Sequence, residues 1–301
     1  MRGDAEGRRA RRAPYRSRVR RVCRRGRASR ERGCGDRGRH RRHGRTRVHG
    51  RALRRPAAAV SADVEQALLL AAGRGVRLGN LTRDTPKPLL DVGGQPIIFR
   101  ILEGLAEAGV RDVTVVTGHL AEGLEAALGD GSRWGVSLRC VRQEQLDGTA
   151  RAAELARPFL SGAPFFVGWG DIVVEGVNYA GVIEGSRETG AAIAVNEVED
   201  PWAGAAVYVD GAMRVLRMVE KPAKGTSTTH WNNAGLAVLP AAIWDEVDRL
   251  EPSERGEYEL PQAIAALVAS GHPVVAVPIE GPWFDIGTPE SLEAARRYFG
   301  S

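Results

Sequence analysis

The 301-residue chain contains very little lysine, cysteine or methionine. It has only three lysines among 43 basic residues, and three cysteines. Cys23 and Cys34 lie in the arginine-rich first segment and Cys140 stands alone in an apolar segment, so neither a disulfide framework nor a zinc-site spacing is present. No apolar run approaches the length of a membrane span. We therefore expect a soluble cytoplasmic protein that has no contact with a membrane.

Two familiar nucleotide-binding motifs are also absent. A P-loop needs the tripeptide Gly-Lys-Ser/Thr, which does not occur in this chain. A dinucleotide fingerprint needs glycines at its first, third and sixth positions. Gly73, Gly75 and Gly79 place the last glycine one position too late.

Charge divides the chain near residues 56–61. Residues 1–59 hold 23 arginines, no lysine and four acidic residues, whereas the remainder has 20 basic and 33 acidic residues. Because the first segment has almost no apolar periodicity, we expect residues 1–61 to be an arginine-rich disordered extension. Residues 62–301 then form a single folded domain.

Three interpretations of the extension stay open. Its arginines could form an arm that binds nucleic-acid phosphates. A targeting peptide fits less well, because no apolar segment follows the arginines. We favour the third, an untranslated extension with the true start near residues 60–64, because the folded pattern begins directly after residue 62.

Strand-like and helix-like segments alternate through residues 62–301. Apolar runs predict strands at 67–71, 113–116, 136–141, 165–167, 192–195, 206–209, 215–219, 233–239 and 274–277. Helical spacing predicts helices at 97–105, 120–128, 149–159, 179–188, from 243, near 264–268 and at 290–298. This alternation predicts an α/β fold with a doubly wound, Rossmann-like, mostly parallel but mixed sheet. Ligands of such sheets bind where strands end.

The first strand runs into a loop rich in glycine and basic residues. Its sequence is Leu-Leu-Leu-Ala-Ala-Gly-Arg-Gly-Val-Arg-Leu (68–78), followed by Thr-Pro-Lys-Pro-Leu-Leu (85–90). Glycine lets backbone N–H groups approach an oxyanion, and Arg77 and Lys87 add positive charge. The loop therefore predicts a cradle for nucleotide phosphates.

These two strings resemble the signature of the sugar-1-phosphate nucleotidylyltransferases, and the resemblance extends from about residue 66 to 299. It implies the nucleotide-diphospho-sugar transferase type of fold. The implied reaction transfers a nucleotidyl group from a nucleoside triphosphate to a sugar 1-phosphate and releases pyrophosphate. Arg77 and Lys87 become the catalytic residues, and the first part of the loop binds the nucleotide through Leu70, Ala71, Ala72, Gly73 and Gly75.

Two aspartates after strands are candidate metal ligands. Taken alone, Asp171 is a turn or cap residue, and Asp285 belongs to a loop before a helix that Thr288 caps and Pro289 opens. The resemblance implies instead that Asp171 and Asp285 hold Mg²⁺, a cation that prefers carboxylate and phosphate oxygens.

Residues 143–150 resemble the family's base-recognition loop. An amide can donate to and accept from a pyrimidine edge, which suits Gln143. Gly148 would let the backbone approach the base or ribose, with Thr149 beside it. Without the resemblance, this is equally a polar loop in which Thr149 is a helix N-cap.

The resemblance also implies a sugar-phosphate side formed by Gly204, Glu220, Lys221 and Asn233. On surface statistics alone Glu-Lys-Pro is a solvated turn, yet two of the three lysines in the chain occupy motif positions. The string Glu-Tyr-Glu-Leu (257–260) also resembles a family string, without a clear chemical role.

Gln143 five residues before Gly148, with Asp147 before that glycine, most resembles the uridylyl- and thymidylyltransferase members. The resemblance implies UTP or dTTP, and glucose 1-phosphate is the default partner. A guanylyl- or cytidylyltransferase of the same family is an alternative. A nucleotide-sugar-dependent glycosyltransferase is another, although it has no need of Arg77 and Lys87. A homo-oligomer is compatible with the sequence, and nucleic acid is a partner only if the arginine-rich extension is part of the protein.

Overall fold

The computed structural model describes residues 64–300. The predicted extension over residues 1–61 lies outside the described residues, so its boundary stays a prediction. Among the described residues, no helix is long and apolar enough to cross a membrane.

Four neighbouring parallel strands form one half of a nine-stranded sheet. They are β1 (Gln66–Ala71), β4 (Asp112–Thr117), β5 (Ser137–Arg142) and β6 (Phe165–Trp169), in the order β5-β4-β1-β6. Leu68 and Leu69 of β1 are both fully buried, but in two different core clusters. A central strand covered on both faces needs a continuous apolar run, which explains the sequence of β1.

The other half of the sheet is built around β11 (Trp231–Leu239), which runs antiparallel to β6. Its further strands are β8 (Ala192–Glu197), β9 (Ala205–Val209), β10 (Val215–Glu220) and β12 (Val275–Pro278). Four parallel and four antiparallel pairings join the described strands of this sheet. The predicted mixed α/β class is confirmed, with the parallel pairs concentrated in the first half.

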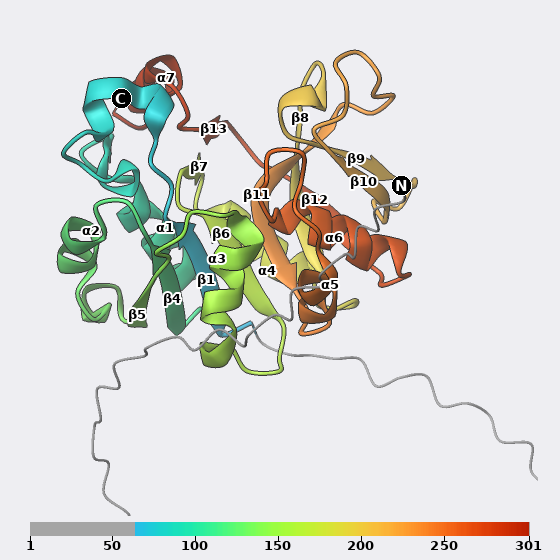
Figure 1. Cartoon of the computed structure of the whole chain (residues 1–301), viewed down its shortest axis with the longest axis horizontal. Helices are drawn as coiled ribbons and strands as arrows, with labels where there is room; N and C mark the ends of the chain where they lie inside the picture. The colour runs from blue at the N-terminus through green and yellow to red at the C-terminus, as the bar shows by residue number, and fades with distance from the viewer. Residues whose placement is uncertain (1–63, 301) are drawn as a thin grey trace, which may run out of the picture. The chain divides into compact units, whose positions relative to one another are not determined.

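Of the seven α-helices in the described chain, six lie along the two faces of this sheet and the last lies beyond its edge (Figure 1). The core beside Leu69 includes α1 (Ile97–Glu107), α2 (Ala121–Leu128), α4 (Val177–Gly185) and α7 (Pro289–Phe299). The core beside Leu68 includes α3 (Thr149–Ala156), α5 (Ile243–Arg249) and α6 (Leu260–Ala269). The helix predicted over 149–159 stops being α-helical at Ala156 and continues as a 3₁₀ turn, Arg157–Phe159. Pro158 explains the change, because proline disrupts the preceding α-helical turn.

Several short elements were not predicted. They include two 3₁₀ helices, Val76–Thr82 and Lys87–Leu89, and two small antiparallel pairs, β2 (Asp91–Val92) with β3 (Gln95–Pro96) and β7 (Ile172–Val174) with β13 (Trp283–Asp285). Most of these segments have only two or three residues and carry no periodicity, and the seven-residue Val76–Thr82 is interrupted at Gly79. The β7–β13 pair matters most, because it brings the chain before α7 to the end of β6.

Helix α7 begins as predicted, with Thr288 as N-cap and Pro289 as first residue. The Thr288 hydroxyl accepts a hydrogen bond from the Ser291 amide at 3.3 Å, and the Ser291 hydroxyl accepts one from the Thr288 amide at 3.1 Å. The helix lies beside the segment that follows the glycine-rich loop (Figure 1), where Arg296 Nε donates to the Asp91 carbonyl at 3.0 Å. The end of the described chain thus supports the basic loop near its start.

Candidate active site

The glycine-rich loop that follows β1 has an open conformation. Gly75 has φ +64°, a value that favours glycine, and its carbonyl accepts hydrogen bonds from the Leu78 amide at 2.9 Å and the Thr82 hydroxyl at 3.0 Å. Gly73 and Arg77 are exposed. The loop is therefore held from its C-terminal side, while its tip is accessible to a ligand.

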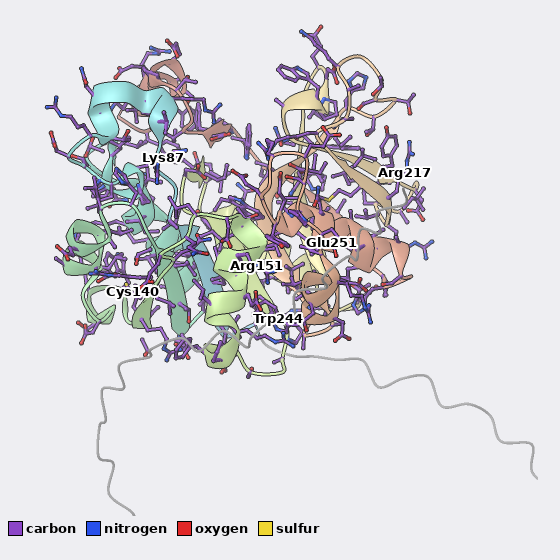
Figure 2. All side chains as sticks on the ribbon, in the orientation of Figure 1. Lys87, Cys140, Arg151, Arg217, Trp244 and Glu251 are labelled. Atoms are coloured by element: carbon purple, nitrogen blue, oxygen red, sulfur yellow. The ribbon has the colours of Figure 1, made fainter. Side chains whose placement is uncertain are left out.

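Lys87 and Asp171 form an ion pair across the end of the sheet. Lys87 is 8% exposed, which is rare for a lysine, and its ammonium group donates to a carboxylate oxygen of Asp171. Figure 2 shows Lys87 on the segment that follows the glycine-rich loop. Asp171 lies one glycine beyond the end of β6, the strand next to β1, so the sheet brings Asp171 and Lys87 together.

Asp285 and Arg77 lie near this ion pair. In the β7–β13 pair Asp285 lies opposite Ile172, and the Ile286 amide donates to the Asp171 carbonyl at 3.0 Å. Arg77 packs against Gly287, where an added Cβ would lie 2.7 Å from a guanidinium nitrogen. The structure therefore brings together all four predicted catalytic and metal-binding side chains, Arg77, Lys87, Asp171 and Asp285.

The two carboxylates repel one another in this cluster. Burial raises the pKa of Asp285, and the negative charge of Asp171 raises it further, while Lys87 and Arg77 act in the opposite direction. A divalent cation would relieve this repulsion, so the residues fit Mg²⁺. Among the described residues no group of three or more His, Cys, Asp or Glu could hold a metal, so phosphate oxygens and water would complete the coordination.

Gln143 lies at the end of β5 and supports the loop that follows it. Its side chain is 7% exposed, and its amide nitrogen donates to the Gly148 carbonyl at 3.1 Å and to Asp147 at 3.2 Å. The residue predicted to read the base thus also fixes the shape of the predicted base loop.

The structure explains the glycine at position 148 by packing within the chain, and not by the predicted approach of a base or ribose. Gly148 has φ +124°, and an added Cβ would lie 2.2 Å from the Tyr258 carbonyl oxygen. The Tyr258 amide donates to the Asp147 carbonyl, and the Ala150 amide donates to the Tyr258 carbonyl, both at 2.8 Å. Glycine is therefore required by the chain's own packing.

The alternative that makes Thr149 a helix N-cap is wrong. The cap position of α3 is Gly148, without a side-chain cap bond. The Thr149 hydroxyl instead accepts a hydrogen bond from the Leu260 amide at 2.8 Å, which joins α3 to the start of α6.

We expect Gly148→Ala to lower the free energy of unfolding by about 3 kcal/mol, because it adds both backbone strain and a backbone clash. Gly135→Ala is the matched control. Gly135 has φ +69° and no atom within 4 Å of an added Cβ, so only the strain of about 1 kcal/mol applies. Urea unfolding of both variants measures the difference, and equal losses would contradict the clash with Tyr258.

Three of the predicted sugar-phosphate residues lie together at the end of β10. The Lys221 amide donates to the Gly204 carbonyl at 2.7 Å, with Lys221 at φ +44°. The Lys221 ammonium lies 3.5 Å from Glu220 Oε1. Gly204 packs against the Asn232 side chain, where a Cβ would lie 2.2 Å from Oδ1.

Asn233, the fourth predicted residue, lies on β11 beyond the end of β6. Leu236 pairs with Gly168 in opposite directions, so the start of β11 extends past the edge where Asp171 lies. The Asn233 Oδ1 accepts a hydrogen bond from the Gly235 amide at 3.3 Å. Both halves of the predicted site therefore lie at the same edge of the sheet.

Sequence reasoning missed two residues beside Lys221 and Gly204. Glu259, in the string that had no clear role, is 7% exposed and has Oε2 at 3.6 Å from the Lys221 ammonium. Asn232 is 5% exposed, accepts from the Ala205 amide at 3.2 Å and donates to Asn196 at 3.0 Å. Only the string around Glu259 gave a signal in the sequence.

An open glycine-rich loop, a buried lysine and two neighbouring carboxylates lie at one edge of a mixed α/β sheet, at the ends of its parallel strands, where such sheets bind ligands. The chain belongs to the nucleotidyl transferase family, whose model matches residues 66–299.

Curated relatives and a solved structure agree with this assignment. The low-salt glycan biosynthesis nucleotidyltransferase Agl11 of Haloferax volcanii is 36% identical over 76% of this chain and 64% of its own length. The glucose-1-phosphate thymidylyltransferase of Streptomyces antibioticus is 33% identical over 74% of this chain and 62% of its own. The chain thus spans less than two thirds of these two relatives. A candidate glucose-1-phosphate thymidylyltransferase from Bacillus anthracis, crystallised with sucrose, matches with a TM-score of 0.71 and 26% identity over 78% of this chain and 95% of its own.

Proposed function

We propose that the protein transfers a nucleotidyl group from a nucleoside triphosphate to a sugar 1-phosphate, giving a nucleoside diphosphate sugar and pyrophosphate. One observation carries the proposal: the buried Lys87 is paired with Asp171 beside Asp285 and Arg77, under an open glycine-rich loop. This arrangement provides separate charges for the phosphates of one triphosphate.

In the proposed reaction, a phosphate oxygen of the sugar 1-phosphate forms a bond to the α-phosphorus. The bond from that phosphorus to the bridging oxygen of the β-phosphate breaks, and pyrophosphate leaves with the electron pair. Lys87 neutralises charge on the α-phosphate, Arg77 stabilises the leaving pyrophosphate and Lys221 orients the attacking phosphate. Positioning and charge suffice, so no covalent enzyme intermediate is needed.

Asp171 and Asp285 would hold Mg²⁺ in this proposal. When bound, the ion neutralises phosphate charge and orients the triphosphate. Asp171 already contacts Lys87 through its carboxylate, so the lysine also places that ligand.

We infer that the base is uracil or thymine, with glucose 1-phosphate as the sugar partner. The side-chain N–H groups of Gln143 donate to Asp147 and Gly148, so its carbonyl oxygen would accept the N3–H of a pyrimidine. The Streptomyces relative is named for thymidylyl transfer to glucose 1-phosphate, in agreement with this choice. The cytoplasmic location, a homo-oligomer and binding of nucleic acid stay predictions.

A panel of nucleoside triphosphates against sugar 1-phosphates, read by pyrophosphate release with Mg²⁺, tests the proposal. We expect the highest kcat/KM with dTTP or UTP and glucose 1-phosphate. Activity restricted to GTP or CTP would overturn the choice of base. Sugar transfer from a nucleotide sugar, without pyrophosphate release from any pair, would overturn the reaction.

A further inference from the structure

The Lys221 ammonium lies between two buried carboxyl groups at nearly equal distances. It is 3.5 Å from Glu220 Oε1 and 3.6 Å from Glu259 Oε2, both longer than a close hydrogen bond. The side chains of Glu220 and Glu259 are 12% and 9% exposed, whereas that of Lys221 is 40% exposed. The two buried carboxyl groups therefore hold the Lys221 ammonium, while the partly exposed lysine side chain leaves it accessible to a ligand.

Glu259 is itself fixed by three neighbours. The Arg255 guanidinium pairs with Oε1, the oxygen that faces away from Lys221. On one side the Tyr258 amide donates to the Asp147 carbonyl, and on the other the Leu260 amide donates to the Thr149 hydroxyl, both at 2.8 Å. Glu259 thus stands on a segment bonded to the predicted base loop, while its side chain reaches the predicted sugar-phosphate loop.

We propose that Glu259, held by Arg255, is a positioning residue that keeps Lys221 and Glu220 in place for the sugar 1-phosphate. The proposal rests on the proposed function, because it assigns Lys221 to the sugar-phosphate side. It explains why Glu259, which has no assigned contact with a substrate, is buried beside the predicted ligand-binding residues Glu220 and Lys221.

The charges of these groups agree with the geometry. Burial raises the pKa of Glu220 to about 7 against the opposing charge of Lys221, and Glu259 raises it further through a hydrogen bond and its charge. Burial opposes ionisation of Glu259 as well, but the Arg255 hydrogen bond and Lys221 hold its pKa below the usual range. The charge of Glu220 also acts on Arg255. A pKa of about 7 places Glu220 near its midpoint at neutral pH, and its protonated form donates to Glu259.

Kinetics of Glu259→Gln test the positioning role. We expect the KM for glucose 1-phosphate to rise about tenfold, the size of one lost charge-assisted hydrogen bond, with the KM for dTTP unchanged. We also expect the inflection near pH 7 in kcat/KM for glucose 1-phosphate to move to lower pH, because Glu220 ionises more easily without a neighbouring carboxylate. The substrate phosphate titrates equally in all variants, so only differences between them count.

Glu257→Gln is the matched control. Glu257 is two residues away, contacts Arg255 at 3.7 Å and is half exposed. We expect its KM values and pH profile to match those of the unchanged protein. Glu259→Asp keeps the charge but shortens the side chain, so its KM is expected to rise with a smaller shift of the inflection.

A carboxyl titration by ¹³C NMR, with Glu220→Gln to assign the signal, reads the contact without any activity. We expect a Glu220 midpoint near 7 in the unchanged protein and a lower one in Glu259→Gln. Unchanged KM, pH profile and midpoint in Glu259→Gln would overturn the positioning role. If no triphosphate and sugar phosphate pair releases pyrophosphate with the unchanged protein, the proposed function fails instead, and the titration still tests the contact.

Discussion

Lys87→Ala is expected to lower kcat by about 10²–10³-fold, the usual cost of losing one preorganised group that stabilises transition-state charge. Lys87 is buried, so water cannot replace its charge efficiently. No other lysine is near it in the sequence. The alanine also leaves Asp171 without its ion-pair partner. Initial rates of pyrophosphate release measure the change.

Two comparisons separate this effect from a general loss of structure. Lys224→Ala removes an exposed lysine that lies 5.4 Å from the Trp202 ring, and its rate is expected to stay close to that of the unchanged protein. Circular dichroism of Lys87→Ala should match that of the unchanged protein at assay temperature. A correctly folded Lys87→Ala with a kcat within about threefold would rule out a charge-stabilising role of the usual size.

The strands of the first half could be predicted from the sequence because both faces of the sheet are covered. Leu68 and Leu69 face opposite cores, so the run that contains them must be apolar throughout. The direction of β11 could not be predicted, since an apolar strand has the same composition whichever way it runs. Its pairing with β6, with Leu236 opposite Gly168, determines the direction.

The candidate site could be predicted where the sequence resembles the family's motifs. Lys87 and Asp171 were expected on that ground, and the structure pairs them. Contacts between distant segments were not predictable. Glu259 meets Lys221 only because Tyr258 and Leu260 bond to the loop around Gly148, and no local pattern encodes that contact.

The same limit applies to glycines. Gly148 was expected to make room for a ligand, yet its missing side chain makes room for Tyr258. Gly287 is the opposite case, because the sequence suggested only a loop residue before a helix. In the structure its lack of a side chain lets Arg77, a predicted catalytic residue, pack against it. A glycine therefore indicates close approach, while the structure identifies what approaches.

Asp171→Asn and Asp285→Asn are each expected to raise the Mg²⁺ concentration for half-maximal activity by more than about tenfold, and to lower kcat by about 10²-fold at saturating Mg²⁺. Each change removes one of two carboxylates, and the described residues offer no third acidic or His/Cys ligand to replace it. Rates measured across a Mg²⁺ series give both quantities.

The two changes differ in what they do to the remaining carboxylate. Burial and the charge of Asp171 raise the pKa of Asp285, so Asp171→Asn should let Asp285 ionise at lower pH, with Lys87 free to pair with it. As the pH is lowered, the apparent Mg²⁺ affinity of Asp171→Asn is therefore expected to fall at a lower pH than that of the unchanged protein. Asp245→Asn, an exposed aspartate in the first turn of α5, is the control and should leave the Mg²⁺ series unchanged. An equal Mg²⁺ requirement in all three variants would contradict a metal held by Asp171 and Asp285, because the cation would then be bound by substrate phosphates alone.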